Sequence, residues 1–106
     1  MASKKLKVLV TDAIDQEGLK SLAAHPGIEL RYELAPPAAK LETALKGVGA
    51  WLVRSETKVT SAWIDKAGDL RLIARAGVGV DNIDLAAATR RGIAVINAPA
   101  ANTVAA

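Results

Sequence analysis

Two arginines and one glycine-containing segment are the residues of this sequence best suited to bind a ligand. Arg54, followed by Ser55, comes directly after an apolar segment, and Arg75 precedes a Gly77-Val78-Gly79 sequence. A guanidinium binds phosphate or carboxylate through a planar fork of donors. Glycines let backbone N–H groups approach a ligand, because no Cβ stands in the way. The pattern predicts a site for a small molecule with two anionic groups.

Short apolar segments alternate with helical patterns along the chain. Apolar or alternating segments predict strands over residues 7–11, 28–34, 50–53, 70–74 and 93–96. Helices are expected over 16–24 with Asp15 as its cap, between Pro36-Pro37 and the glycines Gly47 and Gly49, after Thr60, and over about 84–91. This alternation is typical of an α/β protein with a parallel sheet. We expect a flavodoxin-like three-layer sandwich with a five-stranded, doubly wound sheet in the order 2-1-3-4-5.

The expected sheet brings the candidate residues to one edge, because ligands of open α/β sheets bind beyond the carboxyl ends of the strands. Thr11-Asp12, Arg54, Arg75 and Asn97 each follow a predicted strand. The amides of Val78 and Gly79 could hold one carboxylate there, and the two guanidiniums a second anionic group. The alternatives are that the arginines form surface ion pairs, that Gly-x-Gly is a tight turn, and that Asp12 caps a loop.

Composition excludes several classes of protein. The 106 residues contain no cysteine, which rules out disulfides and thiolate zinc sites. The single histidine, His25, is expected in a His-Pro-Gly turn, so we predict neither a metal site nor a Ser-His-Asp set. The net charge of +3 comes from scattered basic residues, and no apolar run approaches about 20 residues. We therefore expect no nucleic-acid or membrane partner. We also find no pattern of a signal peptide near the N-terminus, so we expect a cytoplasmic protein.

Four segments resemble one enzyme family. They are LVRSETKVT at 52–60, RAGVGVDNID at 75–84, ATRRGIAVINAP at 88–99 and NTVAA at 102–106. In these segments the chain resembles the D-3-phosphoglycerate dehydrogenases, a branch of the D-2-hydroxyacid dehydrogenase superfamily. Members oxidise 3-phosphoglycerate to 3-phosphohydroxypyruvate with NAD, in serine biosynthesis.

The resemblance implies a domain organisation and a set of site residues. Residues 4–99 would form the substrate-binding domain and 100–106 the truncated start of a hinge helix, with the Rossmann cofactor domain absent. The implied substrate-binding residues are Arg54, Ser55, Arg75, Gly77, Val78, Gly79 and Asn102. No catalytic residue is expected in this chain, because the family supplies its catalytic Arg, Glu and His from the Rossmann domain.

The resemblance also implies what the chain binds. We expect it to bind 3-phosphoglycerate weakly and without turnover, with no cofactor of its own and with the missing Rossmann domain as its natural partner. Loss of a returning C-terminal segment would uncover apolar surface, which self-association would hide. The first alternative is a folding or assembly unit without ligand competence. The second is an unrelated flavodoxin-like signalling or flavin module.

Overall fold

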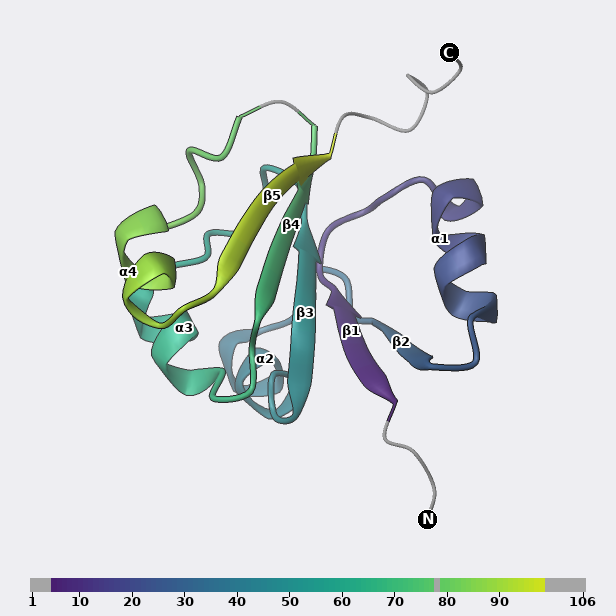
Figure 1. Cartoon of the computed structure of the whole chain (residues 1–106), viewed down its shortest axis with the longest axis horizontal. Coiled ribbons are helices and arrows are strands. Elements are labelled where there is room, and N and C mark those ends of the chain that lie inside the picture. Colours follow the sequence, from purple (N-terminus) through teal and green to yellow (C-terminus); the bar gives the residue numbers. More distant parts are fainter. Residues whose placement is uncertain (1–4, 78, 99–106) are drawn as a thin grey trace.

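The computed structural model describes residues 5–77 and 79–98, which form one parallel sheet with helices on both faces (Figure 1). The strands are β1 (Leu6–Val10), β2 (Ile28–Tyr32), β3 (Val48–Val53), β4 (Leu72–Ala76) and β5 (Ala94–Ala98). The helices are α1 (Gln16–Ala24), α2 (Ala38–Ala44), α3 (Ser61–Lys66) and α4 (Leu85–Arg90). The strand order is β2-β1-β3-β4-β5, which confirms the predicted flavodoxin-like sheet.

The order of the strands decides which face each helix covers. From β1 the chain moves to β2 on one side, then crosses back to β3 and continues in that direction to β4 and β5. Because parallel crossovers are right-handed, the reversal of direction puts α1 on one face and α2, α3 and α4 on the other (Figure 1).

Side-chain caps begin three of the helices. Asp15 Oδ1 accepts from the Glu17 amide (3.1 Å), and Thr60 Oγ1 accepts from the Trp63 amide (3.4 Å). Asp84 caps α4 in the same way. These caps satisfy N–H groups that have no partner within the helix. The predicted caps Asp15 and Thr60 are confirmed, and α1 has the predicted bounds.

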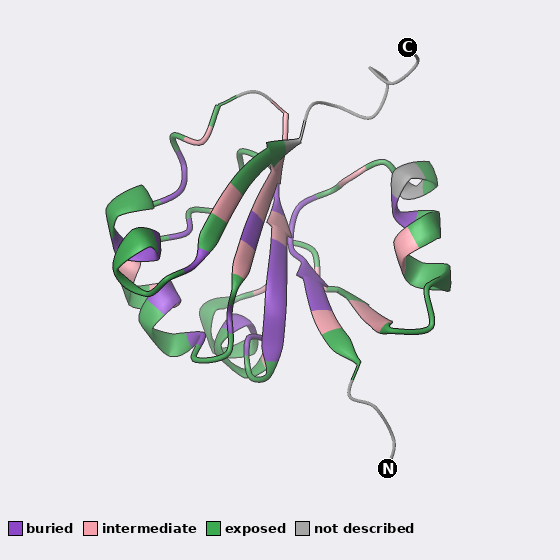
Figure 2. Cartoon of the chain, viewed as in Figure 1, coloured by how far each residue is buried: buried purple, intermediate pink, exposed green. Residues whose placement is uncertain are grey.

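The main core lies between the sheet and helices α2, α3 and α4. Leu9, Trp51 and Ile73 are aligned across β1, β3 and β4, and all three are fully buried. β3 is the most buried strand, as the purple ribbon in Figure 2 shows. Trp51 is therefore a core residue.

The opposite face of the sheet is only partly covered. α1 packs beside β2, whereas Leu52 and Ala74 on the same face are half-buried. Ile96 of β5, which is aligned with Ala74, keeps 48% of its surface exposed. The described residues therefore leave apolar surface only partly covered over β3, β4 and β5.

All five strands differ from their predicted bounds by one or two residues. β1 covers 6–10 rather than 7–11, and β2 ends at Tyr32 rather than at residue 34. β3 begins at Val48, so Gly49 lies within the strand against Leu6 rather than ending a helix. β4 covers residues 72–76 rather than 70–74, and β5 covers 94–98 rather than 93–96. Arg75 and Asn97 therefore lie inside strands and are aligned with each other, because the backbone ladder continues beyond the apolar residues.

Among residues 5–77 and 79–98, no helix has the length and hydrophobicity to span a bilayer. Val78, Asn102 and the expected start of a hinge helix at 100–106 lie outside the described residues.

Candidate functional site

The carboxyl edge of β3 and β4 holds the two predicted arginines. Arg75 is aligned with Val53, the last residue of β3, so Arg54 is the next residue beyond that pair. Arg54 and Ser55 are exposed in the loop after β3. Gly77 and Gly79 lie in the loop after β4. The structure thus brings both predicted segments to one edge of the sheet.

A buried carboxylate organises the loop that carries Arg54. Asp12, two residues after β1, is 5% exposed. Its Oδ2 accepts from the backbone amides of Arg54 (2.8 Å) and Thr57 (2.9 Å), and its Oδ1 accepts from the Thr57 hydroxyl (2.6 Å). Hydrogen bonds to an ionised acceptor are stronger than neutral ones. Asp12 therefore ties the 54–57 loop to the end of β1.

A chain of hydroxyl groups connects this carboxylate to the core. Trp51 Nε1 donates to Thr11 Oγ1 (3.0 Å), and the Thr11 and Thr57 hydroxyls are 2.8 Å apart. An indole N–H can only donate and a carboxylate can only accept. Because the Thr57 proton goes to Asp12, the Thr11 hydroxyl must donate to Thr57. The direction of every bond from Trp51 to Asp12 is thereby fixed.

Asn82 holds the same loop from the other side. Its Nδ2 donates to the backbone carbonyls of Arg54 and Thr57, each at 2.7 Å. Its own backbone carbonyl accepts from the amide of Val59 (2.9 Å). Asn82 belongs to the segment after Gly79, so it links the loop after β3 to the loop after β4.

Arg75 is mostly buried and contacts the glycine loop. Its side chain is 11% exposed, and Nη1 lies 2.9 Å from Oδ1 of Asp81, whose side chain is 93% exposed. Gly79 packs so closely that an added Cβ would lie 3.3 Å from Nη1, and its φ of +86° also favours glycine. Asn97 Nδ2 donates to the Gly79 carbonyl (2.8 Å). These contacts hold the described part of the loop against Arg75.

The two guanidiniums contact different loops. Arg54 Nη1 donates to the carbonyl of Ala13 after β1 (3.2 Å), whereas Arg75 pairs with Asp81 after β4. The structure therefore places both arginines at one edge without joining their side chains. A ligand that bound both would compete with the Ala13 carbonyl and with the Asp81 carboxylate.

The sequence matches the family model for the D-isomer specific 2-hydroxyacid dehydrogenase catalytic domain over residues 8–106. The chain belongs to this family. It is 45% identical over 100 residues to a D-3-phosphoglycerate dehydrogenase of Synechocystis, and 42% identical over 99 residues to one of Archaeoglobus fulgidus. These matches cover 94% and 93% of this chain but only 18% and 19% of the relatives, so the chain spans about a fifth of their length.

Solved structures of 2-hydroxyacid dehydrogenases also match only part of their length to this chain. A 2-hydroxyacid dehydrogenase from Ketogulonicigenium vulgare is 29% identical, with a TM-score of 0.72, over 88% of this chain and 29% of that one. This chain therefore shares the flavodoxin-like fold of the 2-hydroxyacid dehydrogenases, and its sequence places it in the substrate-binding domain of the family.

The residues at the glycine loop do not fit NAD. A dinucleotide site of the Rossmann type has a third glycine and a helix that begins directly at the glycine turn. Here Asn82 occupies the position of the third glycine, and it holds the neighbouring loop instead. α4 begins only at Leu85, after a cap at Asp84. No NAD-dependent step is therefore assigned to these residues.

Three residues of this edge were missed as site candidates from the sequence. The sequence places Asp12 among the polar residues at the strand ends, with a loop cap as the alternative, but not among the predicted binding residues. Thr57 and Asn82 appear only within the family segments. Their partners lie 25 to 46 positions away in the sequence. The one available signal was that Asp12 is a polar residue directly after a predicted strand. The burial of Asp12 and Asn82 is seen only in the structure.

The remaining titratable residues give no second site. His25 Nδ1 accepts from the Gly27 amide (2.9 Å) in the turn between α1 and β2, as expected for a turn residue. Among the described residues, no three of the His, Cys, Asp and Glu side chains gather in a way that could hold a metal ion.

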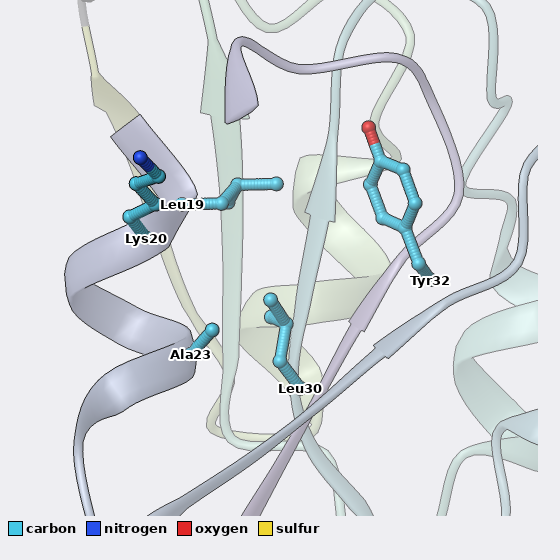
Figure 3. Close-up of a pocket in the computed structure, with 5 residues that line it drawn as sticks. All are labelled: Leu19, Lys20, Ala23, Leu30 and Tyr32. Carbon is cyan, nitrogen blue, oxygen red and sulfur yellow. The ribbon is translucent and has the colours of Figure 1, made fainter. Parts of the chain in front are cut away.

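Several hollows lie outside the arginine edge, and two of them adjoin α1 or the 54–57 loop. Figure 3 shows the first, between α1 and β2, where Leu19, Ala23 and Leu30 point into an apolar space with Lys20 at its margin. The second adjoins the 54–57 loop and is lined in part by Asp12, Thr57 and Lys58. The first is too apolar for a dianion, and neither is lined by Arg54 or Arg75.

Proposed function

We propose that this chain is the substrate-binding part of a D-3-phosphoglycerate dehydrogenase and binds the anionic groups of 3-phosphoglycerate. The proposed binding residues are Arg54, Ser55, Arg75, Gly77, Val78, Gly79 and Asn102. The proposal takes residues 4–99 as the binding domain and 100–106 as the start of a hinge helix.

One observation carries this proposal: the register that aligns Val53 with Arg75, and so puts Arg54 and Arg75 at one edge of the sheet. Arg54 is exposed, and the carboxylate paired with Arg75 belongs to the highly exposed Asp81. Because the Asp81 side chain is 93% exposed, water can solvate its carboxylate when a ligand anion takes its place at Arg75. The identity to D-3-phosphoglycerate dehydrogenases supports the choice of 3-phosphoglycerate as the ligand.

We propose that the chain alone does not turn over. Oxidation of a hydroxy acid requires a hydride acceptor and a general base. The glycine loop does not fit NAD, and His25 lies in a turn away from the arginine edge. In this proposal, the cofactor and the reacting groups come from the four-fifths of the relatives' length that this chain does not match.

A two-dimensional amide NMR titration with 3-phosphoglycerate tests the proposal, with sulfate at equal ionic strength as the reference anion. Saturable shifts confined to residues 54–55 and 75–79 are expected, with a Kd of about 1 mM, because half of the cleft is absent. Arg54→Ala and Arg75→Ala should weaken binding at least about tenfold, the equivalent of one lost charge-assisted contact.

The matched control is Arg71→Ala. Like Arg54, Arg71 is exposed. It directly precedes β4, whereas the proposed site lies at the carboxyl ends of the strands, so Arg71 lies at the opposite edge of the sheet. Its loss should leave the 3-phosphoglycerate affinity unchanged. Equal effects of all three substitutions would mean that only the net charge matters, and would contradict the proposed site.

A second candidate is a folding or assembly unit with no ligand competence. The ion pair between Arg75 and Asp81 favours it, because the guanidinium already has a partner (2.9 Å). Spectra that stay flat, or that respond equally to sulfate and to 3-phosphoglycerate, would support this candidate over the binding proposal.

A further inference from the structure

We infer that Asp12 and Asn82 are positioning residues of the anion site, which together hold the 54–57 loop so that Arg54 and Ser55 face the ligand. This inference rests on the proposed function, because the ligand it concerns is the one proposed there. Neither residue is expected to touch that ligand.

The first argument is the pattern of the hydrogen bonds. Asp12 accepts from the amides of Arg54 and Thr57, and Asn82 donates to the carbonyls of the same two residues. The N–H and C=O groups at both ends of the loop are therefore fixed by two side chains from outside it. The loop's own exposed side chains at 54, 55 and 56 take no part in these four bonds. They remain exposed to solvent, although the Arg54 guanidinium also donates to the Ala13 carbonyl, with which a ligand would compete.

The second argument is the rigidity of the two supports. Asp12 follows β1, and the backbone around it is tied to β3 through the Thr11 amide and the Leu52 carbonyl (3.3 Å). Asn82 is fixed through its backbone carbonyl to the amide of Val59 (2.9 Å). Both supports are nine-tenths or more buried. A catalytic or binding loop needs support of this kind, since small displacements of its side chains weaken binding.

The third argument is that Asn82 belongs to the segment that follows Gly79. Its bonds to the Arg54 and Thr57 carbonyls fix the distance between the loop after β3 and the loop after β4. A ligand with two anionic groups needs that distance to be constant. Asn82 therefore sets the spacing between the part of the site at Arg54 and the part at Gly77 and Gly79.

Four variants of this chain test the inference. Asp12→Ala removes the acceptor. Asp12→Asn keeps the two bonds that the inference needs, because its one oxygen can still accept from both amides. Its NH₂ can only donate toward the Thr57 hydroxyl, whose own proton then loses the Asp12 acceptor. Asn82→Asp keeps the size of the side chain but turns oxygens toward two carbonyl oxygens. Ile64→Val, a loss of one buried methylene in α3, is the control for a general loss of stability.

Two quantities are measured on each variant: hydrogen exchange of the Arg54 and Thr57 amides without ligand, and the Kd for 3-phosphoglycerate by NMR titration. In Asp12→Ala and Asn82→Asp, exchange of both amides should accelerate at least about tenfold. If the competent loop is then populated about one tenth of the time, the Kd should rise about tenfold. Asp12→Asn and Ile64→Val should stay within about threefold of the unsubstituted chain in both quantities.

The outcomes separate the inference from the proposed function. Failure of the unsubstituted chain to bind 3-phosphoglycerate overturns the proposed function, and the exchange rates still decide whether the two residues hold the loop. Unchanged exchange in Asp12→Ala and Asn82→Asp overturns the inference, even where binding is observed. An affinity loss in Ile64→Val as large as in Asp12→Ala also overturns it, because a general loss of stability would then explain the effect. If Asp12→Ala does not fold, Asn82→Asp compared with Asp12→Asn gives the same decision.

Discussion

Replacement of Asn82 by alanine should destabilise the fold by about 2 kcal/mol. The substitution removes two hydrogen bonds of 2.7 Å to backbone carbonyls, and a typical bond contributes about 1 kcal/mol net. Two corrections oppose each other. The carbonyls lose buried partners, which adds to the cost. Asn82 Oδ1 is itself buried and has no hydrogen-bond partner among the described residues, so its removal returns part of the loss.

Thermal unfolding of Asn82→Ala and Asn97→Ala measures this effect. Asn97 is a matched control, because its Nδ2 also donates to a carbonyl of this edge, that of Gly79 (2.8 Å), but the residue is exposed. Water can replace an exposed partner, so Asn97→Ala should cost about 0.5 kcal/mol or less. At about 5 °C per kcal/mol for a domain of this size, Tm should fall by about 10 °C and about 2 °C respectively.

Equal Tm values for the two variants would refute this reasoning. They would mean that water replaces the Asn82 amide as easily as the Asn97 amide, and that burial adds nothing to the two bonds. A large loss in Asn97→Ala would instead mean that the glycine loop, rather than the 54–57 loop, is the more stabilising part of this edge.

Two further predictions concern the hydroxyl chain and the uncovered face of the sheet. Thr11→Val leaves the indole N–H of Trp51 buried without an acceptor, so urea unfolding should show a loss of about 2 kcal/mol, whereas Thr43→Val at an exposed hydroxyl should stay within about 0.5 kcal/mol. An equal loss in both variants would show that the buried indole needs no acceptor. We propose that the chain self-associates through the face that carries Ile96, so sedimentation should show a concentration-dependent mass that Ile96→Glu abolishes. A monomeric unsubstituted chain at high concentration would contradict this.

The fold could be predicted because local patterns and general rules of connection agree. Short apolar segments alternate with capped helices, and right-handed crossovers leave few sheet orders. The ends of β4 and β5 were placed wrongly because the prediction followed the apolar residues. Backbone pairing between neighbouring strands extends β4 through Arg75 and Ala76, and no local pattern reports such pairing.

The site was predicted only in part, for a related reason. Arg54 and Arg75 follow or end apolar segments, and the sheet edge brings such residues together. The role of Asp12 could not be predicted, because its bonds to the amides of Arg54 and Thr57 join residues more than 40 positions apart. The pairing of Arg75 with Asp81 is local, six residues along the chain, but it depends on the conformation of the glycine loop.

The uneven packing of the sheet has a consequence for local unfolding. The main core cluster draws on β1, β3 and β4 and on helices α2, α3 and α4, and none of its described members comes from α1 or β2. Local opening costs less where few apolar contacts are lost, so the α1–β2 corner should open well below the free energy of global unfolding. Asp12, Arg54 and Asn82 lie on the other side of this division, bonded to one another and to β3. The arginine edge should therefore remain assembled in molecules whose α1–β2 corner has opened. The bond from Arg54 to the Ala13 carbonyl, in the segment that leads into α1, is the described contact through which ligand binding and the order of that corner would still be coupled.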